Sequence, residues 1–160
     1  MGQKVLLNQM PIAIKDSKID ISSEETTKEL AKDLTHYLKG GEIIYLYGEM
    51  GVGKTTFVRY LINQFQKNKK LHITEVTSPT FNLLNEYDIN DLVIKHYDLF
   101  RLKDESEIKN LDLFENNQST ITLIEWPQLI SKNKSIKTID LIFSYENELN
   151  NRSVKISGLN

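Results

Sequence analysis

The sequence predicts an α/β fold in which helices flank a mixed, largely parallel central sheet, arranged as a single domain over residues 1–160. The stretch "EIIYLY" at 42–47 is short and continuously apolar, which is typical of a strand buried on both faces of a parallel sheet. A glycine-rich octet follows directly and leads into an amphipathic helix. No repeat or linker interrupts a chain whose length suits one domain.

The composition indicates a globular protein and excludes several functional classes. Hydrophobic residues make up 39% and charged residues 26% of the chain, and there is no cysteine to form a disulfide or a thiolate metal site. We see neither a membrane-spanning apolar run nor the long apolar stretch of a secretory signal, so we expect a cytoplasmic protein with no membrane partner. The net charge of −2 argues against a uniformly basic nucleic-acid binder.

The segment that precedes the buried strand predicts one strand and one helix. Weak alternation over 10–21 suggests an N-terminal strand, and 22–41 has the pattern of an amphipathic helix. Ser22 and Glu25 fit a capping box at its start, and a Gly-Gly pair suits its end. The apolar side chains that share one face of this helix are Leu30, Ala31, Leu34, Tyr37 and Leu38.

The middle of the chain predicts a second helix and a pair of strands. Apolar residues recur at helical spacing through about Gln66, namely Phe57, Val58, Leu61, Ile62 and Phe65. Residues 81–89 and 92–100 then flank a short polar connection and predict a hairpin or two neighbouring strands, with the register left open.

The last third of the chain predicts a short helix and three strands. Asp104 and Glu107 fit a capping pattern for a helix over 104–114. Residues 119–127 predict a buried strand that ends at its proline. Residues 137–146 and 152–158 predict two closing strands, paired antiparallel.

The octet "GEMGVGKT" at 48–55 carries the chemistry, because it satisfies the pattern G-x-x-x-x-G-K-[ST] through Gly48, Gly53, Lys54 and Thr55. A loop that points successive backbone N–H groups at phosphates needs glycines and a following helix N-terminus. Both are present in the required order, which predicts a phosphate-loop (P-loop) NTPase fold. A mere strand-to-helix turn would need neither Lys54 nor Thr55.

Residue roles follow from this loop geometry. Backbone N–H groups of roughly Gly51 to Thr56 would cradle the phosphates of a nucleoside triphosphate, Lys54 would reach the β and γ oxygens, and the Thr55 hydroxyl would bind Mg²⁺. The residues assigned to nucleotide binding in this loop are Glu49, Met50, Gly51, Val52, Gly53, Lys54, Thr55 and Thr56.

Two acids at strand ends are candidates for the metal and for hydrolysis. Glu125 closes the strand "ITLIE", and Asp98 closes "IKHYD". Each could hold a metal water or orient the attacking water, or could merely cap a turn. His96 is either a general base or a histidine with ordinary hydrogen bonds, and Arg101 is the arginine placed to meet a phosphate or a partner's acid.

Four motifs in order, "GEMGVGKT", "SPTF", "HYDLFR" and "IEWP", make the chain resemble the TsaE family, formerly YjeE, from about Ser22 to Pro127. The resemblance implies a P-loop ATPase that acts as an accessory subunit. Together with TsaB and TsaD, it would support the placing of a threonylcarbamoyl group on adenosine 37 of tRNAs that read ANN codons. Its hydrolysis would be slow and dependent on those partners, and tRNA would be an indirect partner through the complex.

The resemblance also implies site residues. Lys54, Asp98 and Glu125 would be catalytic, and Thr55, Asp98 and Glu125 would serve the metal. Residues 78–81, including Thr80, would form a switch-like loop near the γ-phosphate, and Trp126 would lie beside the site. The chain departs from the family pattern at Glu49, Val52 and Phe100, where Asp, Ala and Tyr are more usual.

Other readings of the same loop are a nucleotide-gated binding module and a small-molecule kinase. Kinases of this type commonly close arginine-bearing lids over the substrate, and the chain has three arginines in all. A GTPase is a weak alternative, because "NKSI" at 133–136 lacks the Asp of an Asn-Lys-x-Asp base reader.

Overall fold

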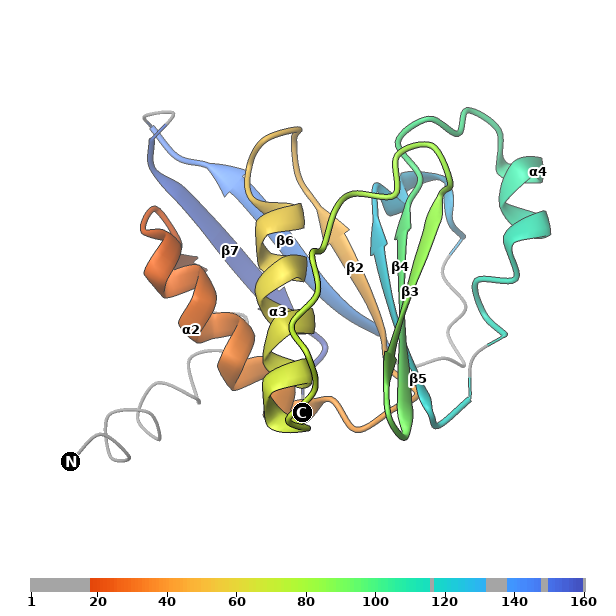
Figure 1. Ribbon diagram of the computed structural model, residues 1–160. Coiled ribbons are helices and arrows are strands. Elements are labelled where there is room, and N and C mark those ends of the chain that lie inside the picture. The colour runs from red at the N-terminus through yellow and green to blue at the C-terminus, as the bar shows by residue number, and fades with distance from the viewer. Residues whose placement is uncertain (1–17, 116, 132–137, 148–149, 160) are drawn as a thin grey trace.

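The structure is a computed structural model that describes residues 18–115, 117–131, 138–147 and 150–159. Its described strands form one sheet in the order β1-β7-β6-β2-β5-β4-β3 (Figure 1). The strands are β1 (Lys18–Asp20), β2 (Ile43–Tyr47), β3 (Leu84–Ile89), β4 (Leu92–Asp98), β5 (Thr120–Glu125), β6 (Thr138–Tyr145) and β7 (Arg152–Ser157).

The centre of this sheet is parallel and its edges are antiparallel. Strand β2 pairs in parallel with β5 and β6, and β4 pairs in parallel with β5. Strands β3, β7 and β1 each pair antiparallel with a neighbour. The predicted α/β class with a mixed, largely parallel sheet is therefore confirmed.

Helices cover the sheet unequally. Helices α2 (Glu24–Leu34) and α3 (Lys54–Asn68) lie together against one face (Figure 1). The short helix α4 (Glu105–Ile108) and the 3₁₀ turns Lys109–Leu111 and Pro127–Leu129 belong to the opposite side, whereas the 3₁₀ turn Thr35–Tyr37 continues α2.

Two apolar cores result, because successive side chains of a strand point to opposite faces. Ile44 and Leu46 of β2 pack beneath α2 and α3, whereas Ile43 and Tyr45 face the other side, where Ile108 is among their partners. The central strands are thus buried on both faces, and this explains why β2 reads as an unbroken apolar run.

The start of the chain departs from one prediction. The N-terminal strand appears as Lys18–Asp20, and the rest of 10–21 lies outside the described residues. Helix α2 begins after Ser23, which makes no side-chain capping bond, so the capping box of Ser22 and Glu25 is wrong. Ser22 is engaged elsewhere, since its Oγ accepts a hydrogen bond from the backbone N–H of Arg152 at 2.9 Å.

The two predicted strand pairs are confirmed. Strands β3 and β4 form an antiparallel hairpin with Ile89 opposite Leu92, and Asn90 takes the left-handed conformation that closes the turn (φ 61°). Strands β6 and β7 pair antiparallel as expected. The segment 133–136, considered above as a guanine reader, lies outside the described residues.

The helix predicted over 104–114 is correct at its start and wrong at its end. Asp104 and Glu107 form the expected capping box. The helix then stops at Ile108 and continues only as a 3₁₀ turn, because Asp112 adopts a left-handed backbone (φ 52°).

Among all described residues, no helix is both long and apolar enough to cross a bilayer.

Tyr45 should make the stability of the fold decrease at alkaline pH. Burial in the second core, with Tyr47 and Asp140 nearby, raises the pKa of Tyr45 to about 12 from an ordinary 10.0. The folded state keeps this proton while the unfolded chain loses it, so stability is intact below pH 10 and declines as the pH rises toward 12. Wild type should lose about 1.4 kcal/mol per pH unit more than Tyr45→Phe over this range.

Urea unfolding of both proteins at pH 9, 10 and 11 measures this difference. The Phe variant retains the ring and removes only the ionisable hydroxyl, so the other tyrosines contribute equally to both curves. Parallel loss of stability in the two proteins above pH 10 would contradict the assignment of the effect to Tyr45.

Candidate nucleotide-binding site

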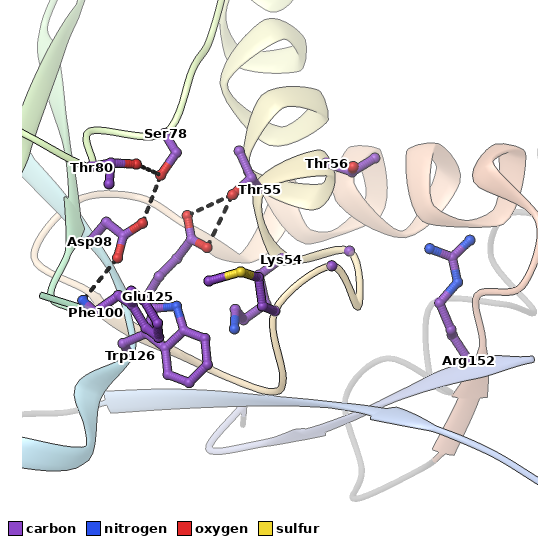
Figure 2. Close-up of a pocket in the computed structure, with 13 residues that line it drawn as sticks. Lys54, Thr55, Thr56, Ser78, Thr80, Asp98, Phe100, Glu125, Trp126 and Arg152 are labelled. Atoms are coloured by element: carbon purple, nitrogen blue, oxygen red, sulfur yellow. Dashed lines mark hydrogen bonds between the residues drawn. The ribbon is translucent and has the colours of Figure 1, made fainter. Parts of the chain in front are cut away.

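The candidate site lies where the parallel strands β2, β4 and β5 end. The carboxyl ends of parallel strands meet at one edge of a sheet, and ligands of open α/β sheets bind there. The octet after β2 forms a loop at this edge and runs into α3, which begins at Lys54. A cavity of about 330 Å³ opens beside the loop (Figure 2), lined by Met50, Gly51, Gly53, Lys54, Thr55, Thr56, Ser78, Thr80, Asp98, Phe100, Glu125, Trp126 and Arg152.

The loop holds its shape through glycines and one buried anchor. Gly48, Gly51 and Gly53 have φ angles of 147°, 80° and 120°, which L side chains rarely adopt. A Cβ on Gly48 would lie 2.9 Å from the Phe143 carbonyl oxygen. The Val52 side chain is fully buried in the helical core, so Val52 anchors the loop and, like Glu49, does not line the cavity.

Lys54 is held inside the loop. Its ammonium donates to the carbonyl oxygens of Gly48 and Glu49, the second at 3.3 Å, and lies 3.7 Å from the centre of the Trp126 ring. Only 4% of the residue is exposed. Burial lowers the pKa of Lys54, and the negative charges of Glu125 and Asp98 oppose that shift.

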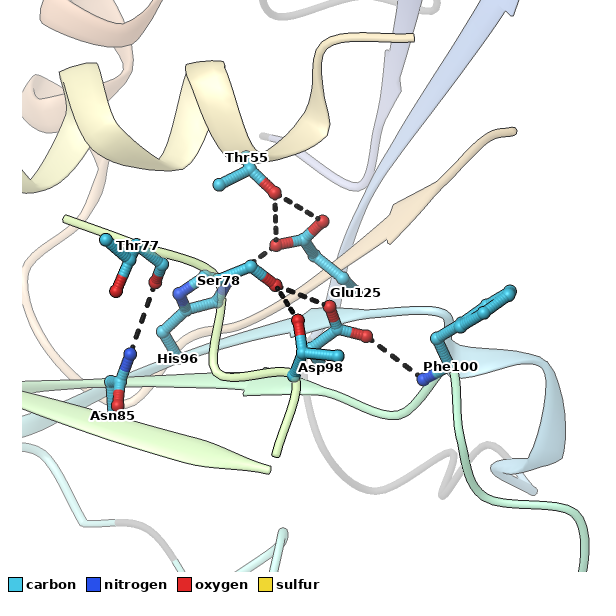
Figure 3. Close-up of polar contacts among 9 residues, drawn as sticks. Thr55, Thr77, Ser78, Asn85, His96, Asp98, Phe100 and Glu125 are labelled. Atoms are coloured by element: carbon cyan, nitrogen blue, oxygen red, sulfur yellow. Dashed lines mark hydrogen bonds and ion pairs between the residues drawn. The ribbon is translucent and has the colours of Figure 1, made fainter. Parts of the chain in front are cut away.

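Thr55 and Glu125 meet directly, although 70 residues separate them in the chain. The Thr55 Oγ1 lies 3.1 Å from both carboxylate oxygens of Glu125 (Figure 3). Parallel pairing of β2 with β5 places Leu46 opposite Glu125, and this register brings the acid to the foot of the loop. The two residues predicted to serve the metal from the loop and from β5 are thus in contact.

His96 lies behind Glu125. Its Nε2 is 2.6 Å from Glu125 Oε2, and the two side chains are 0% and 2% exposed. A carboxylate oxygen accepts hydrogen bonds, so the contact fits the tautomer in which Nε2 carries the proton. His96 does not line the cavity, and its position fits orientation of Glu125 better than the role of a general base acting on bound ligand.

Asp98 occupies the same edge but has different partners. Its Oδ2 accepts from the Ser78 hydroxyl at 2.7 Å, and its Oδ1 accepts from the Phe100 N–H at 3.0 Å. Thr80 extends this network, since its hydroxyl lies 3.3 Å from Ser78 Oγ (Figure 3 shows the Asp98 contacts). Asp98 therefore ties the 78–81 loop to the cavity.

Trp126 forms one wall of the cavity from a strained backbone. Its left-handed conformation (φ 59°, ψ 58°) is uncommon for a large side chain and turns the chain away from β5 into Pro127. The ring then lies between Lys54 and the Phe100 ring, whose centre is 4.8 Å away. The sequence-based placement of Trp126 beside the site agrees with this geometry.

The arginine at the cavity is not the one that the sequence suggested. The Arg101 guanidinium lies 5.1 Å from the centre of the exposed Phe81 ring and does not line the cavity. Arg152, from the start of β7, lines it instead. Arg152 is 97 residues from Thr55 in the chain, and only the pairing of β7 with β6 brings it near, so no local signal could have identified it.

The oxygen groups fit a hard cation. The Thr55 hydroxyl and the Glu125 carboxylate are oxygen ligands of the type that Mg²⁺ prefers, and Asp98 lies on the same cavity wall. Within the described residues there is no cluster of three His, Cys, Asp or Glu side chains that could hold a metal by themselves.

Comparison with known proteins identifies the family. Residues 21–154 match the family model described as "Threonylcarbamoyl adenosine biosynthesis protein TsaE". The chain is 44% identical over 110 residues to the tRNA threonylcarbamoyladenosine biosynthesis protein TsaE of Rickettsia conorii, and this match covers 69% of the chain and 61% of the relative. The match to the protein of the same name from Bacillus subtilis is 38% identical over 109 residues, covering 68% and 65%.

Two further matches cover a larger share of the matched protein. The chain matches 77% of the Rickettsia bellii TsaE protein at 43% identity, with 72% of its own length covered. Against the Rickettsia conorii and Rickettsia felis proteins it spans only 61% and 62% of the relatives' length. The crystal structure of Bacillus subtilis YdiB superposes with a TM-score of 0.67 over 92% of this chain and 88% of that one, and at 22% identity this shows a shared fold. The chain therefore belongs to the TsaE family.

Proposed function

We propose that this protein is an ATPase that binds and slowly hydrolyses Mg-ATP as an accessory subunit in the synthesis of N6-threonylcarbamoyladenosine in tRNA. Membership of the TsaE family supports the pathway. The proposed partners are TsaD and TsaB, and tRNA is engaged through their complex. ATP and ADP are the proposed nucleotides, and Mg²⁺ is the proposed metal.

One observation carries the proposal: the Thr55 hydroxyl is within 3.1 Å of both Glu125 oxygens at the start of a helix whose first residue is a buried lysine. A structural turn needs no such convergence of hydroxyl, carboxylate and ammonium. A triphosphate needs all three, since charge must be neutralised, the metal held and a water oriented. The cavity beside these groups, with its two cationic side chains, suits a phosphate chain.

In the proposed reaction, Thr55 and Glu125 would hold Mg²⁺, and the bound ion would neutralise charge on the phosphates. Lys54 leaves its contacts with the loop carbonyls and donates to phosphate oxygens. Glu125, kept in place by His96 Nε2–H, accepts a hydrogen bond from the attacking water. Asp98 couples the Ser78 hydroxyl, and with it the 78–81 loop, to the site.

A second candidate is a nucleotide-gated binding module in which hydrolysis is incidental. The observation that favours it is the exposure of three large apolar side chains near the cavity: Phe81 is 83%, Met50 64% and Phe100 49% exposed. Met50 and Phe100 line the cavity, and Phe81 follows Thr80 in the chain. Exposed apolar side chains so close to the nucleotide suit a partner that senses the nucleotide state.

The test of the proposed function is partner stimulation. Purified protein should release phosphate from ATP slowly, and adding TsaB and TsaD should raise the rate by roughly tenfold or more, because a partner that completes a P-loop active site has effects of this size or larger. Phosphate release is measured with and without Mg²⁺ chelation, and complex formation is followed in parallel by size-exclusion chromatography.

The parallel readout makes a negative result informative. An unchanged rate in a preparation that demonstrably forms the complex would refute partner stimulation and favour the binding module. A GTP preference over ATP in the same assay would overturn the assignment of the nucleotide.

A further inference from the structure

Arg152 is the cationic side chain on the cavity wall opposite the acids. Glu125, Asp98 and Trp126 lie on one side of the loop, whereas Arg152 projects from the far side (Figure 2). Its guanidinium is close to the loop itself, since a Cβ on Gly53 would be 3.8 Å from its terminal nitrogen. The cavity therefore has positive charge on both sides of the loop, from Lys54 and from Arg152.

The backbone of Arg152 is fixed to the connection between β1 and α2. Its carbonyl oxygen accepts from the Ile21 N–H at 2.9 Å, and its own N–H donates to Ser22 Oγ at 2.9 Å. These bonds place the Cα of Arg152 independently of its side chain. A substitution that changes only the side chain leaves them available.

The guanidinium of Arg152, in contrast, has few partners among the described residues. Its one side-chain hydrogen bond among the described residues is to the Ser22 carbonyl, at the long distance of 3.5 Å. No described carboxylate lies within 4 Å of it, and the nearby Glu24 is engaged by Arg59 at 3.1 Å and by Tyr60 at 2.8 Å. An arginine carries five N–H donors in a planar fork that matches phosphate oxygens, so most of its capacity is available to a ligand.

The order of groups along the loop indicates which part of a nucleotide Arg152 meets. Thr55 and Glu125 mark the end where the metal and the γ-phosphate belong, and Lys54 serves the β and γ oxygens. Thr56 and Arg152 follow on the other side. We propose that Arg152 is a second cationic ligand of the nucleotide and binds its α-phosphate. This inference rests on the proposed ATP site and adds a binding residue to it.

The test compares nucleotide binding by wild type, Arg152→Ala and Arg152→Lys, using isothermal titration calorimetry with Mg-ADP and Mg-ATP. Loss of charge-assisted hydrogen bonds to a phosphate should weaken both nucleotides by about tenfold to a hundredfold in the alanine variant. Lysine keeps the charge without the fork and should recover part of the loss. Lys155→Ala is the control, because it removes one positive charge from the exposed side of the same strand.

Titrations at low and high salt separate a phosphate contact from contact with the base. If Arg152 binds phosphate, Arg152→Ala should also show a weaker dependence of affinity on salt. Lost affinity with unchanged salt dependence, or a loss confined to ATP, would overturn the α-phosphate assignment. The assignment would also be overturned if Arg152→Ala, shown to be folded by its melting temperature, bound both nucleotides with affinities within twofold of wild type. Absence of nucleotide binding by wild type would instead overturn the proposed function as well.

Discussion

Replacement of Glu125 by glutamine should lower the rate of ATP hydrolysis by about a hundredfold or more, which is the range for loss of a group that orients or deprotonates the attacking water. Glutamine has nearly the same shape, so the contacts with Thr55 and His96 can be replaced by neutral hydrogen bonds. ATP affinity should therefore change far less than the rate. Phosphate release in the presence of the partners and calorimetric titration of Mg-ATP measure the two quantities.

Glu86→Gln provides the matched control for this experiment. Glu86 lies on the exposed side of β3, so the same chemical change there alters net charge without touching the cavity. Hydrolysis by Glu125→Gln at the wild-type rate would contradict the assigned role. If the variant binds ATP, fails to cleave it and still supports tRNA modification, the nucleotide-gated binding module is the better account.

The parts of the fold that the sequence predicted are those governed by local patterns. A continuous apolar run identified β2, helical spacing identified α3, and the G-x-x-x-x-G-K-T pattern between them indicated where the candidate site lies. Each pattern reflects burial or backbone geometry within a few residues. The same locality explains why Glu125 and Asp98, both at strand ends, were found without knowledge of the sheet order.

The parts that escaped prediction depend on contacts between distant segments. The local sequence favoured Ser22 as a helix cap, but in the fold its hydroxyl accepts a hydrogen bond from the backbone N–H of Arg152 at the start of β7. Arg101 followed Asp98 and was favoured for that reason, whereas strand pairing brings Arg152 to the loop. The direct contact of His96 with Glu125 follows from the β4–β5 register, which a sequence does not display.

Glu125 and Asp98, for which the sequence predicted the same roles, have different surroundings. Glu125 contacts the hydroxyl of Thr55 and a buried histidine, so its carboxylate lies beside the glycine-rich loop. One oxygen of Asp98 accepts from the Ser78 hydroxyl in the 78–81 loop, and the other accepts from the backbone N–H of Phe100, which follows β4. Their predicted metal and catalytic roles remain proposals, and the contacts favour Glu125 for the water and Asp98 for the loop.

Replacement of Lys54 by alanine should weaken Mg-ATP binding by roughly a hundredfold, since it removes charge-assisted bonds to the phosphates. The folded state should tolerate the change, because burial already lowers the pKa of Lys54 and the variant no longer has to bury an ammonium group. Affinity is measured by calorimetry and by the fluorescence of Trp126, the only tryptophan in the chain.

Trp126 is a direct reporter here because the Lys54 ammonium lies 3.7 Å from the centre of its ring. If ATP draws Lys54 from the ring to a phosphate, wild-type fluorescence should change on binding, whereas Lys54→Ala should start from a different intensity and show little further change. Lys67→Ala, which removes an exposed lysine near the end of the same helix, should behave as wild type. If calorimetry gave Lys54→Ala and Lys67→Ala the same ATP affinity, Lys54 would not be a nucleotide ligand. Its contacts with the loop carbonyls would then be structural only.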